Sequence, residues 1–391
     1  MPIAEPTGPH IFARRRAALM ARAAARGFDG VLAFGHGSAL GAGSHSHGAL
    51  RYLSGWDGHE SAALLAITHQ AAHLFVASPF MAPLARMQRS DLVLHDVRPQ
   101  AWRSTLAGIL PGPAATIGFG EMPAQIHATF APHADAALDD EAARLRLVKD
   151  ATELRHHRAA AALCDLLFGR LGDALLSRRP AWEIQLDLET LARRSGAEQC
   201  RTWLTIAPQA DYCRYWPAET QQVPQAGDQV LFGVALTLDG HWGHGIRMGA
   251  IGPMTPEQRA LADHVAAMLD AGLGAIRPGA PLAGIEAAIE GALADSGLAT
   301  HPGLRRFRSG HGLGFSYEEP LLTEAFRQHF DQGAPPAAPP DIALAPGMLF
   351  ELHPNLFVPG LGGAAIGEMV LVTPDGPDCL LATPRAPAVW T

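Results

Sequence analysis

The chain has 391 residues and a formal net charge of −8 at pH 7, and 48% of its residues are hydrophobic. That length is typical of two domains with a substantial core. The negative balance argues against a general nucleic-acid binder, and neither a membrane-spanning apolar run nor the core of a signal peptide is found. We therefore expect a cytoplasmic protein.

The first 150 residues predict an α/β domain. Short apolar runs at 30–34 and 62–67 alternate with turns and with stretches of helical character. Short apolar runs of this length are typical of buried strands in a mixed sheet.

The remaining residues predict a second domain that begins with helices. Residues 152–195 read as two helices. A further helix is expected after Thr255, which caps its start, with Pro256 in the first turn and Gln258 reaching back as in a capping box. The proline-rich stretch 332–340 lacks amide donors, and we expect it to be a surface loop.

Three histidines of this second domain lie inside distinctive motifs. His244 lies in residues 239–247, His311 in the glycine-rich residues 309–315, and His353 in residues 346–354. An isolated histidine is more often structural than ligating. The significance of these three therefore depends on whether they converge.

Together these motifs resemble those of the creatinase, prolidase and methionine aminopeptidase superfamily (family M24), in which each one positions a metal ligand. Residues 51–56 are similar to the N-terminal domain of the creatinase and prolidase branch, and the turn at 227–228 leads into a strand as in the family. The resemblance implies an α/β (α+β) chain with a creatinase-like N-terminal domain, residues 1–150, and a pitta-bread catalytic domain, residues 151–391. It also implies a homodimer.

Measured against the family, the metal ligands of this chain are altered. Metal-binding members hold two divalent ions with two aspartates, one histidine and two glutamates. Here the two aspartate positions read Gly233 and His244, and the histidine is His311. The two glutamate positions read His353 and Gly367. Two neighbouring ions need bridging carboxylates between them, so we do not expect the usual two-metal centre.

The retained positions favour a centre with one metal ion. In the family fold, the second aspartate, the histidine and the first glutamate converge on one ion, and all three are histidine here. Three imidazoles with an open fourth position resemble a catalytic zinc or iron site. We therefore expect one zinc or iron ion on His244, His311 and His353. The alternative is a metal-free site, as in creatinase, in which His311 carries protons.

Glu351 is the expected proton-transfer residue. If residues 349–353 form a strand, Glu351 and His353 project from the same face. Glu351 would then accept a hydrogen bond from a ligating imidazole or act as a base on water. We name Glu351 and His311 as the catalytic residues.

One loop offers candidates for substrate binding. Many peptidases of the family carry a histidine after the strand that corresponds to residues 203–208, whereas this chain has Tyr212, Arg214, Tyr215 and Trp216 there. An arginine beside aromatic rings suits a small carboxylate, which it can grip with two parallel hydrogen bonds. The alternative is a loop that is packed by its own aromatic rings.

Further substrate-binding candidates come from the resemblance alone: Arg247, Glu318, Glu319 and Arg51. Arg247 matches a frequent arginine of the family, and residues 318–319 lie where the family usually has a His-Glu pair that contacts substrate. In family dimers, the N-terminal domain of one subunit often closes the site of the other. We expect the segment with His45, His47, Arg51 and Trp56 to act as such a lid.

These changes predict a hydrolase that cleaves a C–N bond in a small, non-peptide, nitrogen-containing carboxylate, because the usual two-metal activation of water is lost. Three alternatives remain open. They are an iron-dependent lyase or oxygenase on the same histidines, a metal-free creatinase-like hydrolase, and a non-catalytic binding protein. In each case the partner is a small molecule, with no role for nucleic acid or membrane.

Overall fold

The computed structural model describes residues 6–37, 45–58, 61–76, 78–130, 136–329 and 339–391. Most of the proline-rich stretch 332–340 lies outside these residues. The chain divides into an N-terminal unit (Glu5–Leu147 with Gly314–Leu321) and a C-terminal unit (chiefly Val148–Leu313 with Leu322–Thr391). The short segment 314–321 therefore packs with the N-terminal unit although it is late in the sequence.

The N-terminal unit is built on a five-stranded sheet in the order β4-β3-β2-β1-β5. β1 runs antiparallel to β2 and parallel to β5. The strands are β1 (Gly30–His36), β2 (Ala62–Ile67), β3 (Ala72–Val76), β4 (Val93–Asp96) and β5 (Ala114–Ile117). The helices are α1 (Pro9–Ala25), α2 (His45–Ser54), α3 (Met81–Gln88), α4 (Pro99–Ala107), α5 (Ala124–His127) and α6 (Asp139–Arg146), with a 3-10 turn η1 (Phe119–Glu121).

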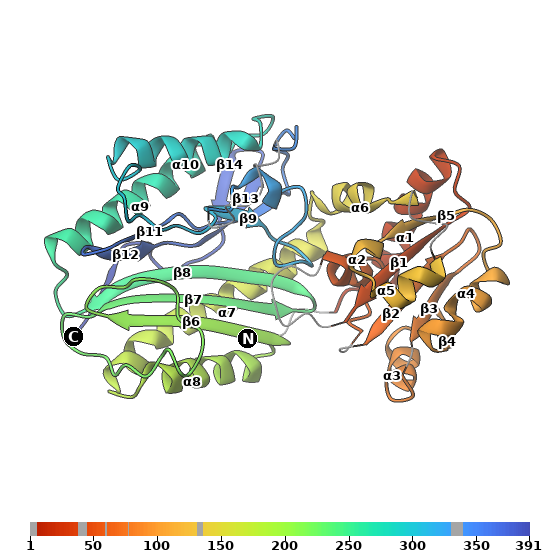
Figure 1. Cartoon of the computed structure of the whole chain (residues 1–391), viewed down its shortest axis with the longest axis horizontal. Coiled ribbons are helices and arrows are strands. Elements are labelled where there is room, and N and C mark those ends of the chain that lie inside the picture. The colour runs from red at the N-terminus through yellow and green to blue at the C-terminus, as the bar shows by residue number, and fades with distance from the viewer. Residues whose placement is uncertain (1–5, 38–44, 59–60, 77, 131–135, 330–338) are drawn as a thin grey trace. The chain divides into compact units, whose positions relative to one another are not determined.

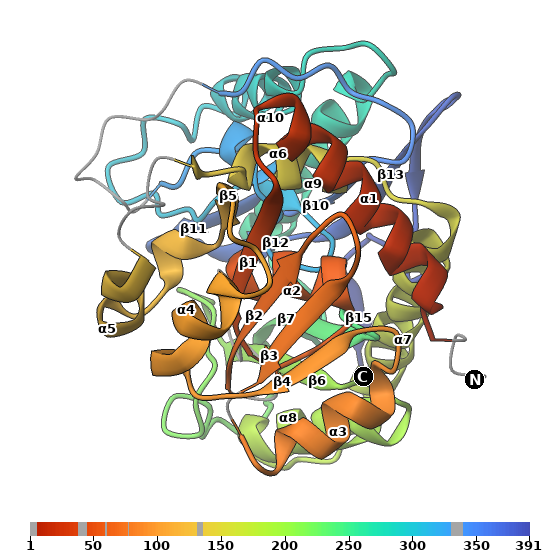
Figure 2. The same cartoon turned by 90° about the vertical axis from the view of Figure 1, so that its right-hand side faces the viewer.

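Both faces of this sheet are buried, because the side chains alternate between two cores. Figure 2 shows the strands β1 to β4 side by side in this sheet. Val31 of β1 belongs to the core that contains residues of α1 and α2. Leu32, the next residue, belongs to the core that contains Trp102 of α4. The apolar runs at 30–34 and 62–67 are therefore strands covered on both sides, which confirms the α/β prediction for this region.

The C-terminal unit contains two four-stranded sheets, in the orders β15-β8-β7-β6 and β14-β13-β10-β9, and a β11-β12 hairpin. The strands are β6 (Gln199–Ala207), β7 (Gln229–Leu238), β8 (His241–Ile251), β9 (Gly310–Gly312), β10 (Leu349–Leu352), β11 (Asn355–Val358), β12 (Gly362–Ala365), β13 (Glu368–Thr373), β14 (Gly376–Cys379) and β15 (Ala388–Trp390). The helices are α7 (Ala151–Leu176), α8 (Ala181–Arg194), α9 (Pro256–Ala275) and α10 (Ala283–Asp295), with a 3-10 turn η3 (Thr323–Ala325).

Figure 1 shows the helices of this unit in two layers, with α7 and α8 on one side of the long strands β6 to β8 and α9 and α10 on the other. The bounds of α7 and α8 confirm the two helices expected in residues 152–195. Of the helices in the described residues, none is long and apolar enough to cross a membrane.

Local signals in the sequence explain where the long helices begin. The hydroxyl of Thr255 accepts a hydrogen bond from the amide of Gln258 (3.2 Å), and the Gln258 side chain accepts one from the amide of Thr255 (3.0 Å). This capping box is the one expected for α9, with Pro256 in its first turn. Asp150 and Glu153 form an equivalent box at the start of α7.

The two sheets of the C-terminal unit meet at Ile246 and Gly367. The amide of Gly367 donates to the carbonyl of Ile246 (3.0 Å), and the amide of Ile246 donates back to the carbonyl of Gly367 (3.4 Å). Since β10 is paired with both β9 and β13, this contact brings the middle of β8 close to β9 and β10.

Candidate metal centre

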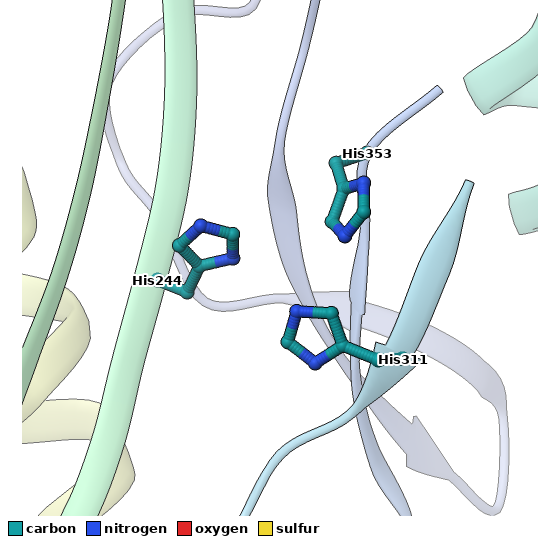
Figure 3. A group of neighbouring side chains, drawn as sticks. All are labelled: His244, His311 and His353. Carbon is teal, nitrogen blue, oxygen red and sulfur yellow. The ribbon is translucent and has the colours of Figure 1, made fainter. Parts of the chain in front are cut away.

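His244, His311 and His353 converge at this meeting of the sheets (Figure 3). His244 lies in the middle of β8, His311 in β9, and His353 directly after β10. The ring centroid of His244 lies 5.5 Å from that of His311 and 5.7 Å from that of His353, and the ring centroids of His311 and His353 are 5.1 Å apart. One ring nitrogen from each residue lies within 4.8 Å of the other two.

A hydrogen bond orients the His311 ring, and a buried carboxyl group lies beside the His244 ring. Nδ1 of His311 lies 3.0 Å from the carbonyl oxygen of Gly312, which can only accept, so this nitrogen carries the proton. Nδ1 of His244 lies 3.2 Å from Oε1 of Glu351. In His311, Nε2 is then left with a lone pair, which is the form of imidazole that binds a metal.

Burial sets the charge states around the cluster. Glu351 lies directly opposite His311 in the β9–β10 pairing and is fully buried. Burial raises the pKa of Glu351 to about 8, although His311 and Arg247 act in the opposite direction. Burial, followed by the two neighbouring histidines, holds the pKa of His353 well below its usual value. His353 is therefore neutral at physiological pH, as a metal ligand must be.

Gly233 and Gly367 stand where the family has metal-binding carboxylates, and neighbouring side chains fill the space next to both glycines. A side chain at Gly233 would collide with the indole ring of Trp203, which lies across it. A side chain at Gly367 would collide with the carboxylate of Glu351 and with the backbone of Ile246. Carboxylates at 233 and 367 therefore have no room in this packing. The imidazole nitrogens of the three histidines fit one divalent metal ion. They do not fit a pair of ions, which would need bridging carboxylates.

A cluster of apolar and aromatic side chains, here called the apolar wall, packs beside the histidines. Trp203, Ile246 and Ala365 form one buried cluster, which Cys213, Tyr215 and Phe307 extend. The ring of Trp203 is 5.3 Å from that of His244, and the ring of Phe307 is 5.4 Å from that of His353. Burial raises the pKa values of Cys213 and Tyr215 to about 12, so both stay uncharged.

Trp203 and Phe307 were not expected as site residues from the sequence, whereas Tyr215 belongs to the loop that was expected to bind substrate. The sequence does contain a signal for Trp203. It lies in the strand just before the loop at 211–216, and the strand after that loop, which can pair with it, consists largely of apolar residues and contains Gly233. The decisive fact is the strand register, which places Trp203 directly opposite Gly233. That register follows from the folded pairing of β6 with β7.

The loop at 211–216 turns only one of the expected residues, Tyr215, toward this wall. Cys213 and Tyr215 face it, whereas Tyr212 and Trp216 are 43% and 62% exposed. The guanidinium of Arg214 lies over the Tyr212 ring and forms an ion pair with Asp211 at 2.7 Å. Arg214 therefore has its contacts within the loop, and the role of Tyr212, Arg214 and Trp216 in substrate binding stays a prediction.

Arg247 lies on the other face of β8 from His244, because the two residues are an odd number of positions apart. Its guanidinium donates to the carbonyl oxygens of Gly367 and Thr383, and it pairs with the buried Glu368 at 3.2 Å. Arg247 therefore holds β8 against β13 and the C-terminal segment, and it does not line the histidine cluster.

The remaining substrate-binding candidates lie in the N-terminal unit, where Glu319 and Arg51 have ion-pair partners. Glu319 pairs with Arg146 at 2.6 Å, and Arg51 pairs with Asp57 at 2.6 Å. Glu318 belongs to the same segment, 314–321. Of the expected lid, His47 lies in α2 with Nε2 3.0 Å from the Asp57 carbonyl, and residues 38–44 lie outside the described part of the chain.

With this geometry established, comparison with known proteins gives a consistent result. The profile of "Metallopeptidase family M24" matches residues 155–374. The "Probable dipeptidase PepE" of Mycobacterium tuberculosis is 28% identical over 281 residues, which cover 69% of this chain and 69% of that protein. The "Xaa-Pro dipeptidase" of Lactobacillus delbrueckii subsp. lactis is 23% identical over 258 residues, 64% of each chain.

The fold is shared with a solved relative. The crystal structure of dipeptidase PepE from Mycobacterium ulcerans has a TM-score of 0.75 and 25% sequence identity, and the match covers 98% of this chain and 99% of that one.

These relatives overturn the expectation of a non-peptidase hydrolase. That prediction relied on the loss of two carboxylates and assumed that peptide-bond cleavage needs the complete two-metal centre. The relatives are named dipeptidases over a large share of the chain, which makes the non-peptidase prediction wrong. The lyase or oxygenase, the metal-free hydrolase and the non-catalytic binding protein gain no support from the same comparisons.

Proposed function

The chain belongs to metallopeptidase family M24, in its creatinase and prolidase branch with the pitta-bread fold, and from that premise we propose that it is a metal-dependent dipeptidase. Its centre, in this proposal, holds one divalent ion, zinc or iron, on His244, His311 and His353. The observation that carries the proposal is the meeting of three buried imidazoles, with ligand atoms within 4.8 Å of one another, inside a family of metallopeptidases.

The packing around the histidines supports one ion in preference to two. Trp203 and Glu351 fill the spaces at Gly233 and Gly367 where further ligands would project. Three neutral nitrogen ligands with an open fourth position match the ligand number of catalytic zinc sites. The chemistry that such an ion supplies is polarisation of a carbonyl group and a lowered pKa of water.

The residues of this chain supply the proton transfer and the substrate surface. Cleavage of a peptide bond adds one water: its oxygen joins the carbonyl carbon, and one proton must reach the leaving nitrogen. Glu351 is the carboxyl group placed to carry that proton, because it is buried beside His244 and His311. Trp203, Tyr215 and Phe307 form an apolar wall that suits an uncharged side chain of the substrate.

The test combines metal analysis with a peptidase assay on protein that is purified without a histidine tag. We expect about one equivalent of zinc or iron to be bound by the His244, His311 and His353 cluster, measured as the difference in metal content between the wild type and the cluster variants. We also expect hydrolysis of members of a dipeptide panel that includes Xaa-Pro sequences. His244→Ala, His311→Ala and His353→Ala should each lower metal content and activity together. His264→Ala, on α9 and outside the cluster, is the control and should change neither.

Two results would contradict the proposal. One is a wild-type protein that hydrolyses none of the dipeptides after loading with zinc, iron or manganese. The other is an active protein whose metal content does not change in the three cluster variants. The cytoplasmic location and the homodimer expected from the sequence are part of the same proposal, and sedimentation of the purified protein tests the second.

A further inference from the structure

A second group of potential metal ligands lies elsewhere in the C-terminal unit. It consists of His156 in α7 together with Asp239 and His241 at the turn between β7 and β8, with one ligand atom of each within 4.8 Å of the others. Nε2 of His156 is 3.5 Å from Oδ2 of Asp239. The rings of His156 and His241 stack with centroids 4.6 Å apart and planes 10° from parallel.

This group is separate from the cluster of His244. Side chains alternate along β8, so His241 and Gly243 share one face and His244 lies on the other. The face of His241 is the one against α7, because a side chain at Gly243 would collide with Ala160 of that helix. The sheet itself therefore lies between the two histidine groups.

The backbone on the strand side is held in place by a tight hairpin. Leu238 pairs with His241, so that only Asp239 and Gly240 form the loop. Both have positive φ angles, 45° and 77°, as in the two-residue type I′ turn that favours Asp-Gly. The amide of Gly240 also donates to the Glu198 carboxylate at 2.8 Å.

The helix side is fixed to the same hairpin. Nδ1 of His157, the neighbour of His156, lies 2.9 Å from the carbonyl oxygen of Trp242 and donates to it. The ring of His157 also meets the ring of His241 edge-on, with centroids 5.1 Å apart. The helix and the hairpin that supply the three ligands are thus joined without any metal. Less conformational entropy is therefore lost when an ion binds.

We propose that His156, Asp239 and His241 form a second site for a divalent transition-metal ion, with zinc the best fit. Two imidazoles and one carboxylate are a common zinc ligand set, with water in the fourth position. The two histidines are buried, while the side chain of Asp239 is 36% exposed and offers a route from solvent.

Binding requires one local adjustment. The lone pair of an imidazole lies in the plane of its ring, so two parallel stacked rings cannot both point at one ion. A rotation of either ring about χ2 corrects this, and that torsion is broad in histidine. The role that follows is structural: the ion would connect the first turns of α7 to the β7–β8 hairpin.

The test isolates this site in full-length protein with the His311→Ala and His353→Ala substitutions, which disable the first cluster. After loading with zinc alone and gel filtration, we expect about one retained equivalent and a raised Tm, because the ion binds only the folded chain. Adding Asp239→Asn should weaken zinc binding at least about tenfold. Asn-Gly also favours a type I′ turn, so this variant keeps the hairpin.

The control is His95→Asn. His73 and His95 form another pair of neighbouring imidazoles, 3.0 Å apart, but this pair belongs to none of the three-ligand groups found in the described residues. Adding His95→Asn to the double variant should leave its zinc content unchanged. His241→Asn, with cobalt in place of zinc, should abolish the absorption bands of tetrahedral cobalt. The proposal is overturned if the double variant retains no zinc, or if it retains zinc that Asp239→Asn and His241→Asn do not affect.

Discussion

Glu351 places its carboxylate in the space that a side chain at Gly367 would occupy. By the family resemblance, position 367 is where a metal-binding glutamate is expected. In this chain a carboxylate reaches that space from another strand, since Glu351 lies in β10 and pairs with His311. A glycine at position 367 thus leaves the room that the side chain of Glu351 occupies.

Gly367→Ala should lower both stability and activity. An added Cβ would meet the carboxylate of Glu351 and would lie 2.5 Å from the amide nitrogen of Ile246. Overpacking of this kind costs about 1–3 kcal/mol of unfolding free energy, and it would displace Glu351 from His244. Urea denaturation and the dipeptidase assay measure the two effects. Gly169→Ala in α7 is the control, because an added Cβ there would meet no atom within 4 Å apart from the nearby backbone of its own helix, and alanine favours the helix.

Glu351→Gln should reduce kcat about 100-fold or more while metal content stays close to that of the wild type. Glutamine keeps the size of the side chain but cannot carry a proton between water and the leaving nitrogen. Glu368→Gln is the matched control, since Glu368 is also a buried glutamate but pairs with Arg247 on the opposite face of β8. Equal losses of kcat in the two variants would argue against a catalytic role for Glu351.

Ordered motifs in the sequence were sufficient to predict much of this structure. The family resemblance placed His244, His311 and His353 at one ion's ligand positions, and the structure brings them together. Thr255 and Gln258 predicted the start of α9 because a capping box is a local interaction.

Side-chain neighbours across strands were not predictable in the same way. Trp203 lies over Gly233 only because β6 and β7 pair in one register. Arg247 matches a frequent family residue, but strand alternation turns it away from His244. A single sequence records neither the register nor the partner that each charged group chooses, and the pairing of Arg214 with Asp211 is a further example.

Trp203→Phe should lower kcat/KM about 2- to 10-fold, mainly through KM. The indole nitrogen of Trp203 is buried and has no hydrogen-bond partner in the described part of the chain. Beside His244, it is placed to donate to a substrate oxygen, and one such hydrogen bond contributes about 0.5–1.5 kcal/mol. Phenylalanine keeps the apolar wall but lacks the donor.

Trp102→Phe serves as the comparison for this prediction. Trp102 is equally buried, but its indole nitrogen already donates to the carbonyl of Val97 at 3.1 Å. That variant should lose stability without a change in KM. If Trp203→Phe behaves in the same way, the indole of Trp203 has a packing role only.

Glu319→Ala should destabilise the N-terminal unit without raising KM. Glu319 and Arg146 form an ion pair at 2.6 Å in which each side chain is 3% exposed. Removing one partner leaves a buried charge uncompensated, which typically costs about 3–5 kcal/mol. Urea denaturation followed by the fluorescence of Trp56 and Trp102, both buried in this unit, measures the loss.

Glu319→Gln separates this structural role from the substrate contact that the family resemblance suggests. Glutamine can still accept hydrogen bonds from Arg146 and from the amide of Ser316, which lies 3.0 Å from Glu319 in the wild type. It should therefore recover part of the stability that alanine loses, because the Arg146 guanidinium keeps an acceptor. A rise in KM in both variants, with the unfolding free energy unchanged, would instead assign Glu319 to substrate binding.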